Sequence, residues 1–160
     1  MHKALSLLIL FLALNNCYSQ IVIENSELKN LPEIINYVND FEGILSIEDE
    51  IIIKNAVESF DRRTKNKIII VTVDSIDPFE NIYDYSLSLA NKIKFNTAVL
   101  IVVSKNLSQI QIQNNDSILD KLTNEETKNI IENYIIPEFK NDNYYKGLIK
   151  GIVEIKKELK

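Results

Sequence analysis

The residues that could support chemistry in this chain are carboxylates at the ends of extended segments. Asp40 closes the short stretch Val-Asn-Asp, and Asp74 and Asp77 follow a β-branched run at residues 67–73. Open α/β sheets bind ligands at the carboxyl ends of their strands, and clustered carboxylates attract Ca²⁺. Asp40, Asp74 and Asp77 are therefore the candidate metal ligands, with calcium as the candidate ion. The alternative is a structural role, because Asp is also the usual residue of turns and loop caps.

Other catalytic chemistries have little support in the sequence. The only histidine is His2 and the only cysteine is Cys17. The chain after them contains no Ser–His or Cys–His pair and no histidine metal ligand, so we expect no catalytic residues and no bound organic cofactor. A hydrolase would depend on carboxylates and a metal. The sequence leaves open whether Asp116 and Asp120 come near Asp74, and the stretch 114–117 lacks the frame of an EF-hand loop.

Composition indicates a globular domain and excludes nucleic acid as a partner. The chain has 160 residues, of which 46% are hydrophobic and 26% charged, which is typical of one folded domain. The formal net charge is −5, and Arg62 and Arg63 are the only arginines. An acidic chain of this kind lacks the basic surface that neutralises phosphates.

The N-terminus predicts export. Lys3 precedes a short apolar run at residues 4–14, and small or polar residues follow as far as Gln20. We interpret residues 1–19 as a signal peptide cut after Ser19, residues 20–33 as a tether, and the mature product as periplasmic or secreted, without a transmembrane anchor. The alternative is a lipoprotein, in which Cys17 would carry a lipid anchor.

Two apolar runs predict the centre of a sheet. Residues 67–73 and 98–103 are continuous and β-branched, as in strands buried on both faces. Apolar residues at helical spacing between them predict a helix around residues 82–93, so the two strands should be parallel. In residues 108–113 isoleucine alternates with glutamine, which predicts an antiparallel partner for the second strand.

Helix signals flank these strands. Ser46 and Thr123 each begin a capping box. The first helix should bury Ile47, Ile53, Val57 and Phe60 along one face. The second should end at Pro137. In the last helix Gly147 and Gly151 predict close helix packing. Together these elements predict one domain over residues 34–158, a three-layer α/β/α sandwich with a small mixed sheet.

The order of these motifs resembles the TPM domain family. That family includes a thylakoid-lumen phosphatase, photosystem repair factors, a levamisole-receptor modulator and exported bacterial proteins. Residues 38–46 resemble its opening V-N-D-x-A-G-x-L-S, and residues 130–139 resemble its I-I-x-x-x-I-I-P-x-F. Residues 143–152 are similar to its closing D-Y-x-x-G-I-x-x-G-I. The resemblance covers residues 34–155 and implies the same sandwich fold.

The loops that carry acidic residues in the family are altered. The family's Asp-Arg pair falls on Leu107 and Ser108, and the aspartate of its L-T-D falls on Asn124. The tryptophan- and glycine-containing loop of the family falls on residues 93–96, which contain neither. We therefore expect a non-enzymatic binding or accessory module for another envelope or membrane protein. The alternative that the resemblance implies is a calcium-dependent acid phosphatase that uses Asp40, Asp74 and Asp77.

Overall fold

The computed structural model describes residues 30–93 and 98–160 of the chain. Residues Glu33–Lys160 form one compact unit. The predicted signal peptide, residues 20–29 of the predicted tether and residues 94–96 of the altered loop lie outside the described residues, so the structure does not test them.

Four strands form the predicted mixed sheet. Its order is β1 (Val38–Asp40), β2 (Lys67–Thr72), β3 (Ala98–Ser104) and β4 (Gln109–Asn114). β1 runs parallel to β2 and β2 to β3, whereas β4 is antiparallel to β3. The three predicted strands are confirmed, and the Val-Asn-Asp stretch adds a short edge strand.

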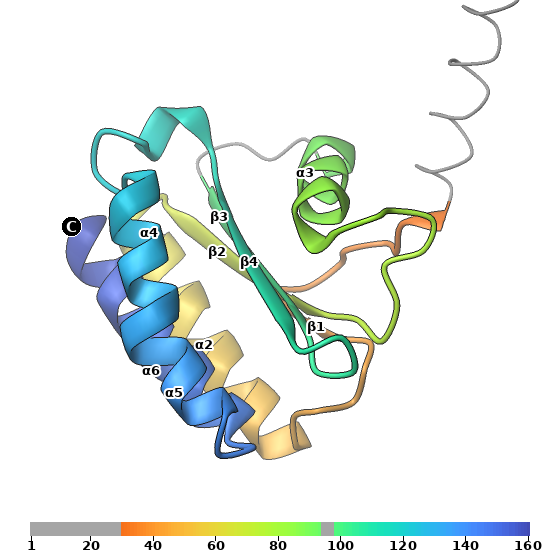
Figure 1. The fold of residues 1–160 in the computed structure, drawn as a ribbon. Coiled ribbons are helices and arrows are strands. Elements are labelled where there is room, and N and C mark those ends of the chain that lie inside the picture. The colour runs from red at the N-terminus through yellow and green to blue at the C-terminus, as the bar shows by residue number, and fades with distance from the viewer. Residues whose placement is uncertain (1–29, 94–97) are drawn as a thin grey trace, which may run out of the picture. The chain divides into compact units, whose positions relative to one another are not determined.

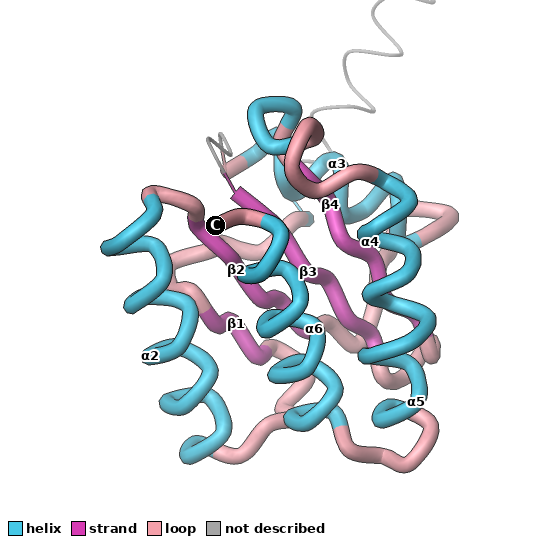
Figure 2. The backbone as a smooth tube through the Cα atoms, turned by 90° about the vertical axis from the view of Figure 1, so that its left-hand side faces the viewer, coloured by secondary structure: helices cyan, strands magenta, loops and turns pink. Residues whose placement is uncertain are grey.

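Helices cover both faces of the sheet (Figure 1). α3 (Ile82–Lys92) lies on one face, where it contacts β3 and β4. On the other face lie α2 (Ile47–Thr64), α6 (Tyr144–Glu158), and a continuous helical run made of α4 (Asn124–Ile130), a π-helical segment (Ile131–Ile135) and α5 (Ile136–Phe139). Figure 2 shows this second layer side by side in front of the strands. A short 3₁₀ helix (Asp116–Ile118) follows β4. The predicted three-layer sandwich is thus confirmed.

The core lies between the sheet and the larger helical layer. α2 contributes Ile53, Val57 and Phe60, each at most 2% exposed. α6 contributes apolar side chains at helical spacing, and the strands contribute their β-branched residues. The prediction that Ile47 joins this face is wrong, because its side chain is 78% exposed. Ile47 is the first residue of α2 and lies on the flank of the helix that faces away from the core.

The helix caps form as the sequence predicts. Ser46 and Asp49 exchange side-chain and backbone hydrogen bonds at the start of α2, and Thr123 and Glu126 do the same for α4. Each capping box satisfies backbone N–H groups that have no partner within the helix. These caps fix where both helices begin.

Pro137 does not end its helix as predicted. The chain remains helical from Asn124 to Phe139, and the π-helical turn widens the helix immediately before Pro137. This wider turn places Pro137 in the first turn of α5, where a proline needs no intrahelical N–H bond. The prediction failed because the chain forms a π-helical turn before Pro137 and then continues as a helix.

The two late glycines let α6 approach the preceding helical run, as expected. A Cβ on Gly147 would lie 2.6 Å from the ring of Phe139, and a Cβ on Gly151 would lie 2.6 Å from the side chain of Ile135. Neither distance is compatible with normal packing. α6 therefore packs against α5 and the π-helical turn through its glycines.

Candidate functional site

The carboxylate of Asp40 holds the loop that leads from β1 to α2. Its Oδ2 accepts the N–H of Leu45 at 2.8 Å, and its Oδ1 accepts the N–H of Ile44 at 3.2 Å and the hydroxyl of Thr72. Gly43 has a φ of 70°, which lets the loop curl back over the carboxylate. Both oxygens of Asp40 therefore serve the fold of its own loop.

Glu42 joins that loop to the turn between β3 and β4. Its two carboxylate oxygens accept the N–H groups of Lys105 and Asn106 at 2.8 and 2.7 Å. The side-chain amide of Asn106 in turn donates to the backbone carbonyl of Asp74 at 3.0 Å. Sequence reasoning missed Glu42, although a signal was present, because the family motif that residues 38–46 resemble has alanine at this position.

The other two candidate ligands lie on the loop after β2. Asp77 accepts a hydrogen bond from the hydroxyl of Ser75 at 2.8 Å, and the Ser75 hydroxyl accepts the N–H of Asp77. This is a local turn motif. Burial, with a smaller contribution from the Asp74 carboxylate, raises the pKa of Tyr85 to about 12.

The strand register separates Asp116 and Asp120 from Asp74. β4 runs back along β3 and ends with Asn114 opposite Val99, at the amino end of β3. Asp116 begins the 3₁₀ helix beyond that point. Asp74 follows the carboxyl end of β2, so these carboxylates lie at opposite ends of the sheet.

The described carboxylates fit calcium poorly. Within residues 30–93 and 98–160, no three His, Cys, Asp or Glu side chains form a group that could hold a metal ion. Calcium takes six to eight oxygen ligands, and Oδ1 of Asp40 already accepts two hydrogen bonds. The metal role of Asp40, Asp74 and Asp77 stays a prediction.

A pocket lies beside the β3–β4 turn, on the side of α5 and α6. We call it the hairpin pocket, and its volume is about 250 Å³. Its lining combines three hydroxyl-bearing residues, one glutamine, one lysine and three apolar residues. The lining residues are Ser104, Ser108, Gln109, Ile110, Ile136, Phe139, Lys140 and Tyr144.

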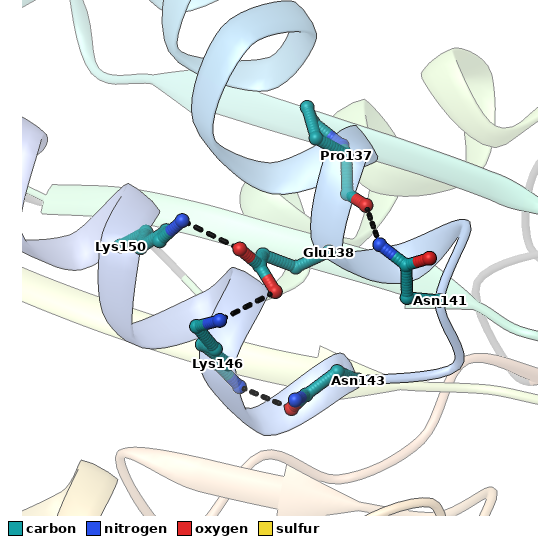
Figure 3. A network of polar contacts seen from close by, with 6 residues as sticks. All are labelled: Pro137, Glu138, Asn141, Asn143, Lys146 and Lys150. Carbon is teal, nitrogen blue, oxygen red and sulfur yellow. Dashed lines mark hydrogen bonds and ion pairs between the residues drawn. The ribbon is translucent and has the colours of Figure 1, made fainter.

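The rim of the hairpin pocket is held by ion pairs. Lys105, on the β3–β4 turn, contacts Asp142 at 2.7 Å and lies 5.1 Å from the centre of the Tyr144 ring. The hydrogen bond to Asp142 raises the pKa of Lys105. Next to the pocket, Glu138 accepts contacts from Lys150 at 2.5 Å and Lys146 at 3.2 Å (Figure 3).

Lys140 differs from these lysines. Among the described residues it has no ion-pair partner, and its side chain is exposed at the pocket. Sequence reasoning missed the hairpin pocket because its walls come from two segments, residues 104–110 and 136–144, that no local motif connects.

Comparisons with known proteins agree on one domain type. A model of the TPM domain matches residues 38–158. No curated protein matches the chain. Among solved structures, the N-terminal domain of a P. gingivalis protein is similar with a TM-score of 0.71 and 23% identity, over 78% of this chain and 82% of that one.

Two further solution structures have the same fold. The BA42 protein of the psychrophilic bacterium Bizionia argentinensis has a TM-score of 0.65 and 23% identity, over 74% of this chain and 83% of that one. The N-terminal domain of the cg2496 protein of Corynebacterium glutamicum has a TM-score of 0.64 and 13% identity, over 82% and 85%. At these identities the likeness concerns the fold alone.

Proposed function

Because this chain belongs to the TPM domain family, we propose that it is an exported, non-enzymatic TPM module that binds a partner protein of the cell envelope through the hairpin pocket. The ligand is the C-terminal residue of an extended segment of that partner. The main support is a set of hydrogen-bond donors that line the pocket and have no acceptor among the described residues.

The donors of the hairpin pocket favour a carboxylate. In the described part of the chain, the hydroxyls of Ser104, Ser108 and Tyr144 donate to no protein acceptor, and the Oγ of Ser104 only accepts the N–H of Leu107. Lys140 adds a positive charge that has no ion-pair partner within residues 30–93 and 98–160. A carboxylate is acceptor-only when ionised and forms strong charge-assisted hydrogen bonds with such groups.

The size and walls of the pocket favour one residue with an apolar side chain. A volume of about 250 Å³ lies below the usual range for cofactor and drug sites. Ile110, Ile136 and Phe139 supply apolar surface in the same pocket as the polar groups. β4 is also an edge strand of the sheet, and an extended peptide can add to such an edge while its terminus enters a pocket.

The alternative, a calcium-dependent acid phosphatase, derives from the family resemblance. It requires Asp40 to coordinate a metal, whereas the oxygens of Asp40 and Glu42 accept backbone N–H groups and hold two loops. This use of the carboxylates supports the binding module over the phosphatase.

The test is an NMR titration of the ¹⁵N-labelled protein with a short peptide that ends in leucine. We expect saturable shifts at the amides of Ser108, Ile110 and Lys140. The same peptide with a C-terminal amide should bind about tenfold more weakly or worse, because a hydrogen bond to a charged group contributes about 1.5–3 kcal/mol. Lys140→Gln should weaken binding similarly, and Lys121→Gln, at an exposed lysine outside the pocket, should not. Equal binding of acid and amide would refute the proposal.

The same samples test the phosphatase. Saturable calcium shifts at Asp40 and Asp74 below millimolar calcium, together with hydrolysis of a phosphate monoester that Asp40→Asn abolishes, would establish the alternative. Calcium modules outside the cell bind no more weakly than the millimolar range. A titration without shifts to several millimolar calcium would remove the metal role.

Export needs a separate test. Among the described residues, no helix is long and apolar enough to span a membrane. The mass of the protein recovered from cells tests the processing directly. A mature chain that begins at Gln20 supports cleavage after Ser19, and a lipid-modified chain that begins at Cys17 supports the lipoprotein.

A further inference from the structure

α2 carries an apolar strip that faces solvent. Ile47 is 78% exposed and Ile51 is 53% exposed, and the two are one helical turn apart. Glu50 and Lys54 lie on the same side of the helix, and the four residues line one groove. We call Ile47, Glu50, Ile51 and Lys54 the outer strip of α2. Exposed apolar groups that gather in one place commonly mark an interaction surface.

The groove connects the outer strip to the β1 edge of the sheet. Its volume is about 210 Å³, and Asn36 and Val38 form its other wall. Val38 belongs to β1, which is the edge strand opposite β4 in the sheet order. Ile35, next to Asn36 in the chain, is 78% exposed. Among the described residues no strand pairs with the outer edge of β1, and such an edge beside exposed isoleucines is a surface on which another chain can pack.

The charges of the outer strip are arranged for a second copy of the same strip. Glu50 and Lys54 are one turn apart, and neither has an ion-pair partner in the part of the chain that the structure describes. In a two-fold symmetric contact, when residue i of one copy meets residue j of the other, residue j of the first copy meets residue i of the second. If two α2 helices cross antiparallel with the axis near residue 52, Glu50 of each copy faces Lys54 of the other. Ile51 then lies next to its own symmetry mate.

We infer that the protein forms a two-fold symmetric dimer through the outer strip of α2 and the edge of β1. The contact buries Ile47 and Ile51 of both copies and forms two equivalent Glu50–Lys54 ion pairs. It uses the β1 edge of the sheet and leaves the hairpin pocket and the β4 edge free. The dimer is therefore independent of the proposed peptide binding.

Sedimentation equilibrium of the purified protein at several concentrations tests the apolar part of the contact. We expect a reversible dimer, and Ile51→Lys should weaken it by tenfold or more. Ile52→Lys is the matched control, because Ile52 is an exposed isoleucine of the same helix that does not line the groove. Circular dichroism should show that both variants remain folded.

A charge-reversal cycle tests the symmetry. Glu50→Lys alone and Lys54→Glu alone should each weaken the dimer, because each places like charges opposite one another. The double variant should restore dimerisation, since the two charges exchange places across the axis. A monomer at all concentrations, a dimer that tolerates Ile51→Lys, or a double variant no better than the single ones would overturn the inference. A monomer in which the Ile51 methyl groups are shielded from solvent would also overturn it, and would assign the groove to another part of the chain.

Discussion

Two neighbouring regions at the carboxyl end of the sheet use their polar groups in opposite ways. Around Asp40 and Glu42, carboxylate oxygens accept N–H groups of the chain, and two loops are held in place. In the hairpin pocket, hydroxyl and ammonium donors remain without protein acceptors among the described residues. The first region is built for the fold, and the second is available to a ligand.

The difference shows why residue type alone does not locate a site. Aspartate is the more conspicuous residue for chemistry, yet here it stabilises a loop. A carboxylate that accepts several backbone N–H groups stabilises the folded state. Hydrogen-bond donors that have no acceptor in the protein and lie beside apolar side chains are instead available to bind a ligand. Substitutions in the first region should therefore change stability, and substitutions in the second should change binding.

The largest effect on stability is expected from Asp40→Ala. The substitution leaves the N–H groups of Ile44 and Leu45 and the hydroxyl of Thr72 without their acceptor. Hydrogen bonds to a charged group contribute about 1.5–3 kcal/mol each, and partial solvation reduces the sum, so we expect a loss of about 2–4 kcal/mol. Urea unfolding measures it. Asp77→Ala, at an exposed turn, should cost less than about 1 kcal/mol, and an equal loss in both variants would contradict the comparison.

Gly147→Ala should affect both properties. A Cβ at this position would lie 2.6 Å from the Phe139 ring, which lines the hairpin pocket. We expect a destabilisation of about 1–3 kcal/mol from overpacking and a displaced ring, with weaker peptide binding. Gly151→Ala is the matched control, because its Cβ would instead meet Ile135, outside the pocket. If the two variants have similar unfolding curves but only Gly147→Ala binds the peptide more weakly, the different roles of the two glycines are confirmed. Unchanged peptide binding in Gly147→Ala would contradict them.

Glu138→Gln should give a pH-dependent change in stability. Hydrogen bonds from Lys150 and Lys146 hold the pKa of Glu138 below its ordinary value of 4.5. A carboxyl group whose pKa falls on folding adds stability that is complete above its unfolded pKa and is lost as the pH falls through the folded pKa. The variant should therefore be less stable than the native protein at pH 6–7, and the difference should shrink below about pH 4.5.

Thermal unfolding from pH 3 to 7 measures this difference. In a Lys150→Gln background the effect of Glu138→Gln should be smaller, because the first of the two lysine contacts is already absent. A difference that stays constant over the whole pH range would exclude the ion pairs as its cause.

The smallest effect on stability is expected from Lys140→Gln. This side chain is exposed and has no ion-pair partner among the described residues, so the free energy of unfolding should change by less than about 0.5 kcal/mol. Peptide binding, measured by the NMR titration, should nevertheless weaken by about tenfold or more. A large loss of stability would show that Lys140 belongs to the structural region after all.

Most of the fold follows from local sequence patterns. Short local patterns predict the central strands, the antiparallel strand and the starts of two helices. These patterns are the β-branched runs, the alternating isoleucines and the two capping boxes, and the structure confirms each prediction. The predictions that failed followed local sequence rules that the tertiary structure overrode. Pro137 was accommodated by a π-helical turn, and Ile47 was left in solvent at the start of α2.

The candidate site was less predictable, because it depends on contacts between distant segments. Asp40 was predicted as a metal ligand, a role that stays a prediction, and only the structure places Thr72 and two backbone N–H groups around it. The sequence did not identify Lys140 as a pocket residue, since an exposed lysine after a helix is common. Glu42 could have been found as a charged residue where the family motif has alanine.

The order of the strands has a consequence for how the molecule folds. In the sheet the strands follow one another as they do in the sequence, β1-β2-β3-β4. Each strand therefore pairs with its predecessor, and none has to insert between two strands that are already joined. Short closures carry the smaller entropy cost, so the sheet can grow at a single edge as the chain emerges residue by residue. α6 is the last of these elements in the chain, so its contact with α2 can form only after the other elements have been synthesised.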